Sequence, residues 1–275
     1  MDKVKILVAC HKPAKVYQDD VYTPIQVGKA LHPDLDLGYI TDDTGDNISE
    51  ENPYYCELTA IYWGWKNLNC EYIGLQHYRR YFNFIFNENN IDNVFKDCDV
   101  VLATPLWSGE SVFKNWMAGL IPEDVYVAFK LLEAMYPDDY EKGKAFFSNP
   151  FFYPCNMFVC KKSLLDEFAK WEFPYLKKLK EVLKLSGYSR EKRILGYIGE
   201  GLLPLYFLNR GYRIKTMDIV PFPNDTHILL RSDLKAKIKS IYRHIISKKS
   251  IVYDDTILAG LRQDKLLDSE NRIIL

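Results

Sequence analysis

The twelve residues Glu71–Phe82, EYIGLQHYRRYF, constrain the fold of this chain more than any other stretch. The apolar run Tyr72–Leu75 has the length and composition of a buried strand. Polar and charged side chains follow it at once, among them His77, Arg79 and Arg80. In open α/β sheets, ligands bind just beyond the carboxyl ends of strands, and adjacent guanidinium groups favour an anion such as pyrophosphate. The segment therefore predicts an α/β sheet with an anion site, unless both arginines simply pair with surface carboxylates.

Strands and helices are predicted to alternate along the rest of the chain. Val4–Cys10 is a run of β-branched and aliphatic residues around a single lysine, as expected for a central parallel strand. Further strands are predicted at Leu35–Thr41, at Asp99–Thr104, within Phe151–Cys160 and from Ile214. Helices are predicted from Asn52 to Leu68, at Ile91–Lys96, at Pro122–Met135, from Ser163 to an interruption at Pro174, and within Arg190–Asn209, with a loop at Trp107–Leu120. This order indicates an α/β fold with a mainly parallel sheet flanked by helices.

Composition, charge and the spacing of cysteine and histidine limit the partners, the location and the metal sites that we expect. The chain has 275 residues, of which 48% are hydrophobic, and its formal net charge is −1. No overall field attracts nucleic acid, which we do not expect as a partner. Six cysteines without a CxxC pair, together with the lack of a signal peptide pattern, predict reduced thiols and a cytoplasmic location. Five scattered histidines lack the spacing of metal ligands, so no metal site is expected.

The last fifty residues differ in character from the rest. Residues 1–225 are predicted to form the main domain, and residues 226–275 a helical C-terminal extension. Apolar side chains recur at helical spacing within 234–249, while lysine and arginine cover the other face. This basic amphipathic segment either contacts an anionic membrane surface, at the inner face of the cell membrane, or packs on the main domain.

The common phosphate-binding and hydrolase motifs are missing from the sequence. GxxxxGK[ST], a GxGxxG after the first strand, GxSxG and HExxH do not occur. The order of elements is instead similar to that of GT-A glycosyltransferases, in which a middle strand delivers an Asp-x-Asp metal motif. Here His77, Arg79 and Arg80 stand in that place. Fixed guanidinium groups can stabilise a departing nucleoside diphosphate without a metal.

A second segment suggests a catalytic base. Gly199-Glu200-Gly201 and the later Gly211–Ile214 are similar to the GED-x-x-L and G-Y-R-[IV] pattern of inverting GT-A enzymes, in which a carboxylate deprotonates the acceptor hydroxyl. Pro204 predicts a helix that starts near Glu200, whose dipole would keep the carboxylate ionised. Gly201 stands where the usual pattern has Asp. Glu200 is therefore a candidate base, or else a plain helix cap.

Five blocks of the sequence closely resemble the domain-of-unknown-function 4422 family of bacterial capsular and exopolysaccharide synthesis proteins, which are regarded as glycosyltransferases. The blocks are Asp42–Ser49, Asn52–Asn67, Glu71–Phe82, Asn156–Lys162 and Tyr197–Phe207. The resemblance implies transfer of a hexose, galactopyranose or galactofuranose first, from a UDP-sugar to a lipid-linked glycan. We expect the transfer reaction to be inverting and metal-independent, although a need for Mn²⁺ or Mg²⁺ stays open.

The resemblance also implies roles for single residues. Uridine and ribose would be held by Ala9, His11, Lys12, Asp42, Asp46 and Asn47. The pyrophosphate and the sugar would face His77, Arg79, Arg80 and Asn156. Lys12 and Asp46 could equally be a solvated loop pair, and Asn156 a buried amide that satisfies backbone groups. The alternative for the whole chain is a non-catalytic nucleotide-sugar-binding or scaffold protein of a membrane polysaccharide assembly.

Overall fold

A computed structural model describes residues 1–224 and 251–275 of the chain. The strands are β1 (Asp2–Cys10), β2 (Tyr22–Gln26), β3 (Ile40–Thr41), β4 (Cys70–His77), β5 (Tyr81–Phe82), β6 (Val100–Ala103), β7 (Leu106–Trp107), β8 (Phe151–Phe152), β9 (Phe158–Lys161), β10 (Ile214–Met217) and β11 (Ile219–Val220). The helices are α1 (Asn52–Tyr55), α2 (Leu58–Asn67), α3 (Ile91–Val94), α4 (Val112–Gly119), α5 (Pro122–Met135), α6 (Pro137–Phe147), α7 (Lys162–Val182), α8 (Ile194–Asn209) and α10 (Asp255–Gln263). The basic segment 234–249 lies outside the described residues.

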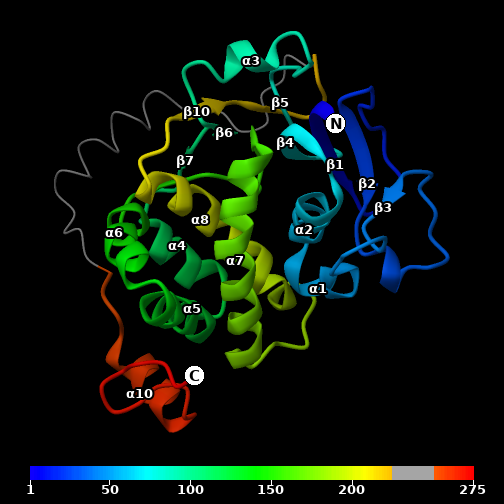
Figure 1. The fold of residues 1–275 in the computed structure, drawn as a ribbon. Helices are drawn as coiled ribbons and strands as arrows, with labels where there is room; N and C mark the ends of the chain where they lie inside the picture. Colours follow the sequence, from blue (N-terminus) through cyan, green and yellow to red (C-terminus); the bar gives the residue numbers. More distant parts are fainter. Residues whose placement is uncertain (225–250) are drawn as a thin grey trace.

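The seven strands of the main sheet follow the order β10-β6-β9-β4-β1-β2-β3 (Figure 1). β1 pairs in parallel with β2 and with β4, and only β9 runs antiparallel to its neighbours β4 and β6. The predicted mainly parallel α/β sheet is thereby confirmed. Because β9 runs the other way, its start lies at the same sheet edge as the carboxyl ends of β1 and β4.

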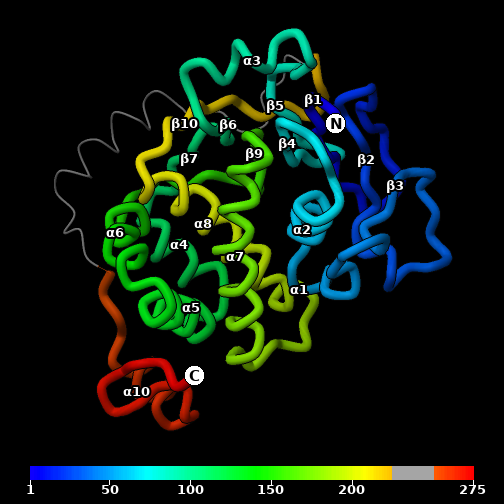
Figure 2. Tube along the Cα trace, viewed as in Figure 1, coloured from blue at the N-terminus to red at the C-terminus, as the bar shows by residue number. Residues whose placement is uncertain are grey.

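The sheet separates two hydrophobic cores. Leu7 of β1 and Ile73 of β4 belong to the core shared with α2, α5, α7 and α8. Ile6 and Tyr72, one residue earlier in each strand, belong to the core on the opposite face, with the α3 segment. Successive side chains of a strand point to opposite faces, so strands covered on both sides are apolar throughout. Figure 2 shows the larger helices gathered on one side of the sheet and α3 on the other.

Two predicted helices differ from the structure. The helix expected from Asn52 to Leu68 is divided at Cys56, whose φ of 54° is left-handed and whose carbonyl accepts from the side chain of Asn52 at 2.8 Å. The interruption expected at Pro174 is wrong, because α7 continues through this residue to Val182. Its apolar face is buried on both sides of the proline, and such packing outweighs the missing backbone hydrogen bond.

Two other segments also correct the expectations. The stretch expected to be a loop at Trp107–Leu120 contains α4, capped at its start by the side chain of Ser111. The strand expected at Leu35–Thr41 is only the two residues of β3. In the described ranges, no helix is both long enough and apolar enough to cross a lipid bilayer.

Candidate functional site

The carboxyl ends of β1 and β4 lie side by side and build one edge of the site. Ala9 is paired in register with His77, and its carbonyl accepts a hydrogen bond from the backbone of Tyr78 at 3.2 Å. His77 and Arg80 then exchange two backbone hydrogen bonds of 3.0 Å, which close a tight turn. The turn leaves Arg79 exposed at its tip. The sheet therefore presents the arginine pair at the edge where ligands of α/β proteins bind, as predicted.

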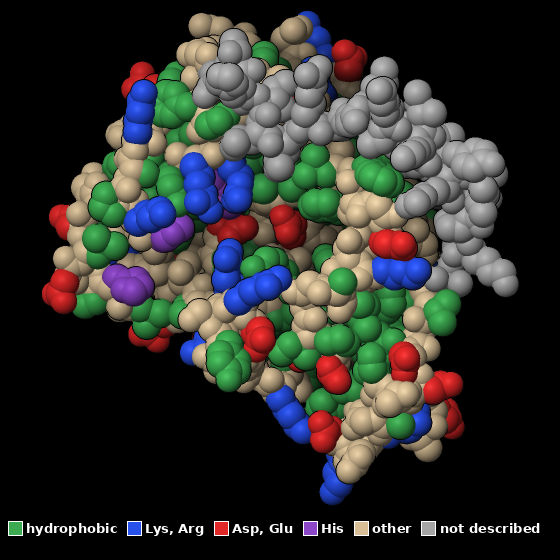
Figure 3. All heavy atoms as spheres, turned by 180° about the vertical axis from the view of Figure 1, so that it is seen from behind, with side chains coloured by type: hydrophobic (Ala, Val, Ile, Leu, Met, Phe, Trp, Pro, Cys, Tyr) green, Lys and Arg blue, Asp and Glu red, His purple; other side chains and the backbone are tan. Residues whose placement is uncertain are grey.

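Basic side chains surround the ring of Tyr78. The guanidinium of Arg79 lies 5.5 Å from the ring centroid, the ammonium of Lys12 lies 6.0 Å from it, and the His11 ring meets it edge-on at 5.4 Å. Figure 3 shows a hollow in this molecule with acidic side chains at its bottom and Lys, Arg and His side chains beside it. Positive charge from β1 and from the turn after β4 is thus concentrated around one residue.

The arginines after β4 make no direct salt bridge in the part of the chain that the structure describes. Neither Arg79 nor Arg80 forms an ion pair with any residue in 1–224 or 251–275. The alternative of a structural surface pair therefore has no support in this part of the chain. Unpaired guanidinium groups at a sheet edge are suited to hold an anion by charge-assisted hydrogen bonds.

A strained turn before β9 forms the centre of the site. Cys155 and Asn156 have φ values of 79° and 49°, in the left-handed region that few non-glycine residues adopt. The side chain of Asn156 donates to Glu57 Oε1 at 2.9 Å and to the Gly196 carbonyl at 3.1 Å. Asn156 is only 2% exposed, and its Oδ1 has no partner among the described residues. Strain of this kind is stored where the surroundings hold the backbone firmly, often at functional sites.

His77 holds the same turn from the sheet. Its Nε2 lies 2.6 Å from the carbonyl oxygen of Cys155. Because a carbonyl can only accept, Nε2 carries the proton in this contact, and Nδ1 is left as an acceptor if the ring is neutral. Burial is the main cause that lowers the pKa of His77, and the charges of Arg79 and Arg80 lower it further against the opposing effect of Glu57. The lowered pKa favours the neutral form of the His77 ring.

Glu200 lies in the middle of α8, not at the start of a helix. The helix begins at Ile194, so the expectation that a helix dipole keeps Glu200 ionised is wrong. Burial raises the pKa of Glu200 to about 7 and the charge of Glu57 adds to this, whereas the Cys155 N–H bonded to its carboxylate, Arg80 and Arg193 oppose the shift. A carboxylate with this pKa can both accept and release a proton near neutral pH.

Gly201 is explained by packing. A Cβ added to Gly201 would lie 2.4 Å from ring atoms of Trp116, so α4 occupies the space where the usual pattern has an Asp side chain. Of the two acidic positions in the usual pattern, this helix therefore keeps only the one at Glu200.

A comparison with known protein families shows which family this chain belongs to. Residues 5–211 match the family described as "Domain of unknown function (DUF4422)". The chain belongs to this family. No curated protein matches it.

A solved structure shares the fold of this DUF4422 protein. The apo structure of the bifunctional glycosyltransferase WbbM is 28% identical in sequence, with a TM-score of 0.74. The match covers 85% of this chain and 47% of WbbM, so the chain spans about half the length of that protein. The predicted GT-A-like class of fold is thereby confirmed.

The acidic loop after β3 is not assembled into the site. Asp42 is fully buried, and its carboxylate accepts from the backbone of Gly28 and Lys29 and from the hydroxyls of Ser49 and Thr59. These four donors use its oxygens to fix the loop. The structure thus gives Asp42 a scaffolding position.

Asp46 and Asn47 lie at the far end of α2. The backbone N–H of Asp46 donates to the side chain of Asn67, the last residue of α2, and its carboxylate lies 3.4 Å from the ammonium of Lys66. Within the described residues, the side chain of Asn47 bonds to the backbone of Gly45 and Ser49 in its own loop. Glu57, by contrast, precedes the first residue of α2. Because ten helical residues span about 15 Å, the structure does not bring this loop together with Asn156.

Two residues that lie beside Asn156 and Glu200 were not predicted from the sequence. Glu57 binds Asn156, and Arg193 donates to the Cys56 sulfur at 3.2 Å and lies near enough to Glu200 to lower its pKa. Glu57 sits in the block Asn52–Asn67, and its position directly before an apolar helical stripe is the signal that could have identified it. No comparable signal marks Arg193.

The described residues contain no group of three or more His, Cys, Asp or Glu side chains that could hold a metal ion. The expectation of a metal-independent reaction stays a prediction.

Proposed function

We propose that this protein is a glycosyltransferase that moves a hexose from a UDP-sugar to a hydroxyl group of a glycan. One observation carries the proposal: the unpaired Arg79 and Arg80 stand at the carboxyl edge of the sheet, and Arg80 lies near enough to Glu200 to lower its pKa. An anion site next to a titrating carboxylate supplies the two groups that glycosyl transfer requires. The likeness to the glycosyltransferase WbbM supports the same reaction class.

The chemistry is a single displacement with inversion. The acceptor oxygen attacks the anomeric carbon and gives its proton to the Glu200 carboxylate, while the bond between that carbon and the diphosphate oxygen breaks. UDP leaves with the bonding electrons. Arg79 and Arg80 stabilise the charge that develops on its phosphates, as a bound metal ion would. Lys12 extends the same positive region, while the His11 ring and Ala9 lie beside it.

The turn at Cys155–Asn156 positions the reacting groups. Its backbone binds Glu200 and His77, and Asn156 binds Glu57, so one strained turn links the base to the sheet edge. Galactose is the first candidate sugar, and a lipid-linked glycan of capsule or exopolysaccharide synthesis the first candidate acceptor. Both follow from the family resemblance, and the reaction that we propose with them takes place at the cytoplasmic face of the membrane.

The test is turnover of a panel of UDP-hexoses in EDTA. We expect the wild-type protein to release UDP from at least one of them, and Arg80→Ala to lower kcat/KM by 10²-fold or more, since removing one stabilising donor typically costs this much. Arg272→Ala is the matched control, because Arg272 is exposed and pairs with Asp268 near the C-terminus. Donor binding without any hydrolysis or transfer would instead favour the non-catalytic alternative.

A further inference from the structure

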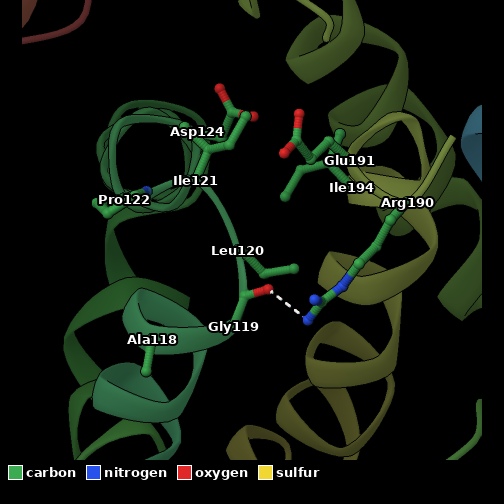
Figure 4. A pocket seen from close by; sticks show the side chains of 9 residues that line it. All are labelled: Ala118, Gly119, Leu120, Ile121, Pro122, Asp124, Arg190, Glu191 and Ile194. Carbon is green, nitrogen blue, oxygen red and sulfur yellow. Dashed lines mark hydrogen bonds between the residues drawn. The ribbon is translucent and has the colours of Figure 1, made fainter. Parts of the chain in front are cut away.

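A separate cavity lies between the α4–α5 connection and the start of α8. Its volume is about 250 Å³. Figure 4 shows Asp124 on one wall, Glu191 and Ile194 on the other, and Leu120 between them. Arg190 closes the lower part by donating to the Gly119 carbonyl at 3.1 Å.

Asp124 is a largely buried residue whose carboxylate lines this cavity. It is 7% exposed, and across residues 1–224 and 251–275 its side chain makes no hydrogen bond or ion pair. Burial and the negative charges of Glu123 and Glu191 raise the pKa of Asp124 to about 6. The carboxylate oxygens of Asp124 are not among the side-chain atoms that are fully shielded from solvent, so they open into the cavity that Asp124 lines. A molecule bound in the cavity can therefore donate a hydrogen bond to them.

The remaining lining defines the ligand class. Leu120, Ile121, Pro122 and Ile194 supply apolar surface, and the polar groups are few. Ligand pockets of this kind bind molecules with an apolar face and a few fixed polar groups. A hydrated divalent cation, which takes six or more oxygen ligands, would not be matched by such walls. A neutral sugar unit fits both features, since its hydroxyl groups donate and its C–H face packs on aliphatic side chains.

The cavity adjoins the site already described. Ile194 and Glu200 are six residues apart in α8, a rise of about 9 Å. On the other wall, α4 contributes Gly119 to the cavity and Trp116 to the contact with Gly201, beside the base. A glycan whose reacting hydroxyl reaches Glu200 could therefore extend into the cavity.

We propose that this cavity is an acceptor subsite, in which a neutral sugar unit next to the reacting one donates a hydroxyl hydrogen bond to Asp124. The inference rests on the proposed glycosyltransferase function and adds the place and the recognition chemistry of the acceptor. Glu191 lines the opposite wall as a second acceptor for the same sugar.

Binding of a panel of methyl glycosides of neutral hexoses, followed by NMR titration at pH 7.5, tests the subsite. We expect the wild-type protein to bind at least one glycoside. Asp124→Asn should raise the dissociation constant of that glycoside about tenfold, the typical effect of a lost hydrogen bond to a charged group. Glu123→Gln is the matched control, because Glu123 is the exposed neighbour of Asp124 and does not line the cavity.

The outcomes separate this inference from the proposed function. Equal glycoside affinities of the wild type and Asp124→Asn would overturn the subsite, and so would a wild-type protein that hydrolyses a UDP-hexose in EDTA yet binds no glycoside. Binding of Mg²⁺ that is lost in Asp124→Asn, without glycoside binding, would overturn it in favour of a cation site. If the proposed function itself is wrong, the wild-type protein will turn over no UDP-hexose in the separate activity assay.

Discussion

At the scale of single residues, Glu200 connects the geometry of the site to a pH dependence. Burial raises its pKa to about 7, and a base must be ionised to accept a proton. We therefore expect kcat/KM to rise with pH through an apparent pKa near 7 and to level off above it. Glu200→Gln should lower kcat by 10²-fold or more and abolish this limb while UDP still binds. An unchanged profile in the variant would show that the base lies elsewhere, with Glu57 the next candidate.

Asn156 has a strained backbone conformation, and its side chain donates two hydrogen bonds that stabilise the turn. Asn156→Ala removes the donors to Glu57 and to the Gly196 carbonyl and keeps the left-handed φ, so we expect a loss of about 2 to 4 kcal/mol in the free energy of unfolding. Asn156→Gly loses the same donors without the steric cost, and should be more stable than the alanine variant by about 1 kcal/mol. Urea denaturation measures both. Equal stabilities would mean that the turn relaxes away from φ 49°.

At the scale of elements, α8 is placed by its glycines. Alanine normally stabilises a helix relative to glycine by about 1 kcal/mol, but a Cβ at Gly201 would meet Trp116 at 2.4 Å. We expect Gly201→Ala to destabilise the protein by about 1 to 3 kcal/mol, and Trp116→Ala in the same chain to relieve the clash. Gly260 of α10 has open space around its Cβ position, so Gly260→Ala should be neutral or stabilising. Thermal unfolding of the three variants checks the contrast, and a stabilised Gly201→Ala would contradict the packing argument.

Elements with a strong local pattern could be predicted from the sequence. β1 and β4 each contain an apolar run, Ile6–Cys10 and Tyr72–Leu75, that polar residues follow. The pairing of Ala9 with His77 brings both polar segments to one edge. The depth of Glu200 in α8 could not be predicted, because Pro204 is tolerated inside this helix as Pro174 is inside α7. In both cases burial of the surrounding apolar side chains outweighs the local preference of proline.

The members of the site were harder to predict than its position. Asp42 and Asp46 look alike in sequence, yet one is buried under four donors and the other lies beside Asn67. Glu57 and Arg193 join the cluster only through tertiary packing. Local sequence carries no record of such long-range contacts.

At the scale of the whole molecule, Glu172, a carboxyl group buried between α7 and α8, is expected to make the stability depend on pH. It is fully buried, and both oxygens lack a partner among the described residues. Burial raises the pKa of Glu172 well above its ordinary value of 4.5, so the folded protein keeps this proton at pH values where the unfolded chain has lost it. The resulting stability is present below pH 4.5 and is lost as the pH rises towards the pKa of the folded state.

Glu172→Met tests this effect, because methionine has a similar volume and no charge. We expect the variant to be more stable than the wild type by about 1 to 3 kcal/mol, the typical cost of an unsatisfied buried polar group, with a larger difference at pH 8 than at pH 5. Glu181, half-way exposed on the same helix, provides the control substitution Glu181→Met. A difference that shrinks as the pH rises would contradict the assignment.

The anion site at the end of β4 is the claim on which the proposed mechanism depends. A crystal structure of the protein with UDP, grown in EDTA, tests it most directly. We predict that the two phosphates lie within hydrogen-bonding distance of the Arg79 and Arg80 guanidinium groups, on the side of the site where Glu200 lies. Phosphates bound away from the His77–Arg80 turn would contradict the account, as would UDP that binds only when a divalent metal is restored.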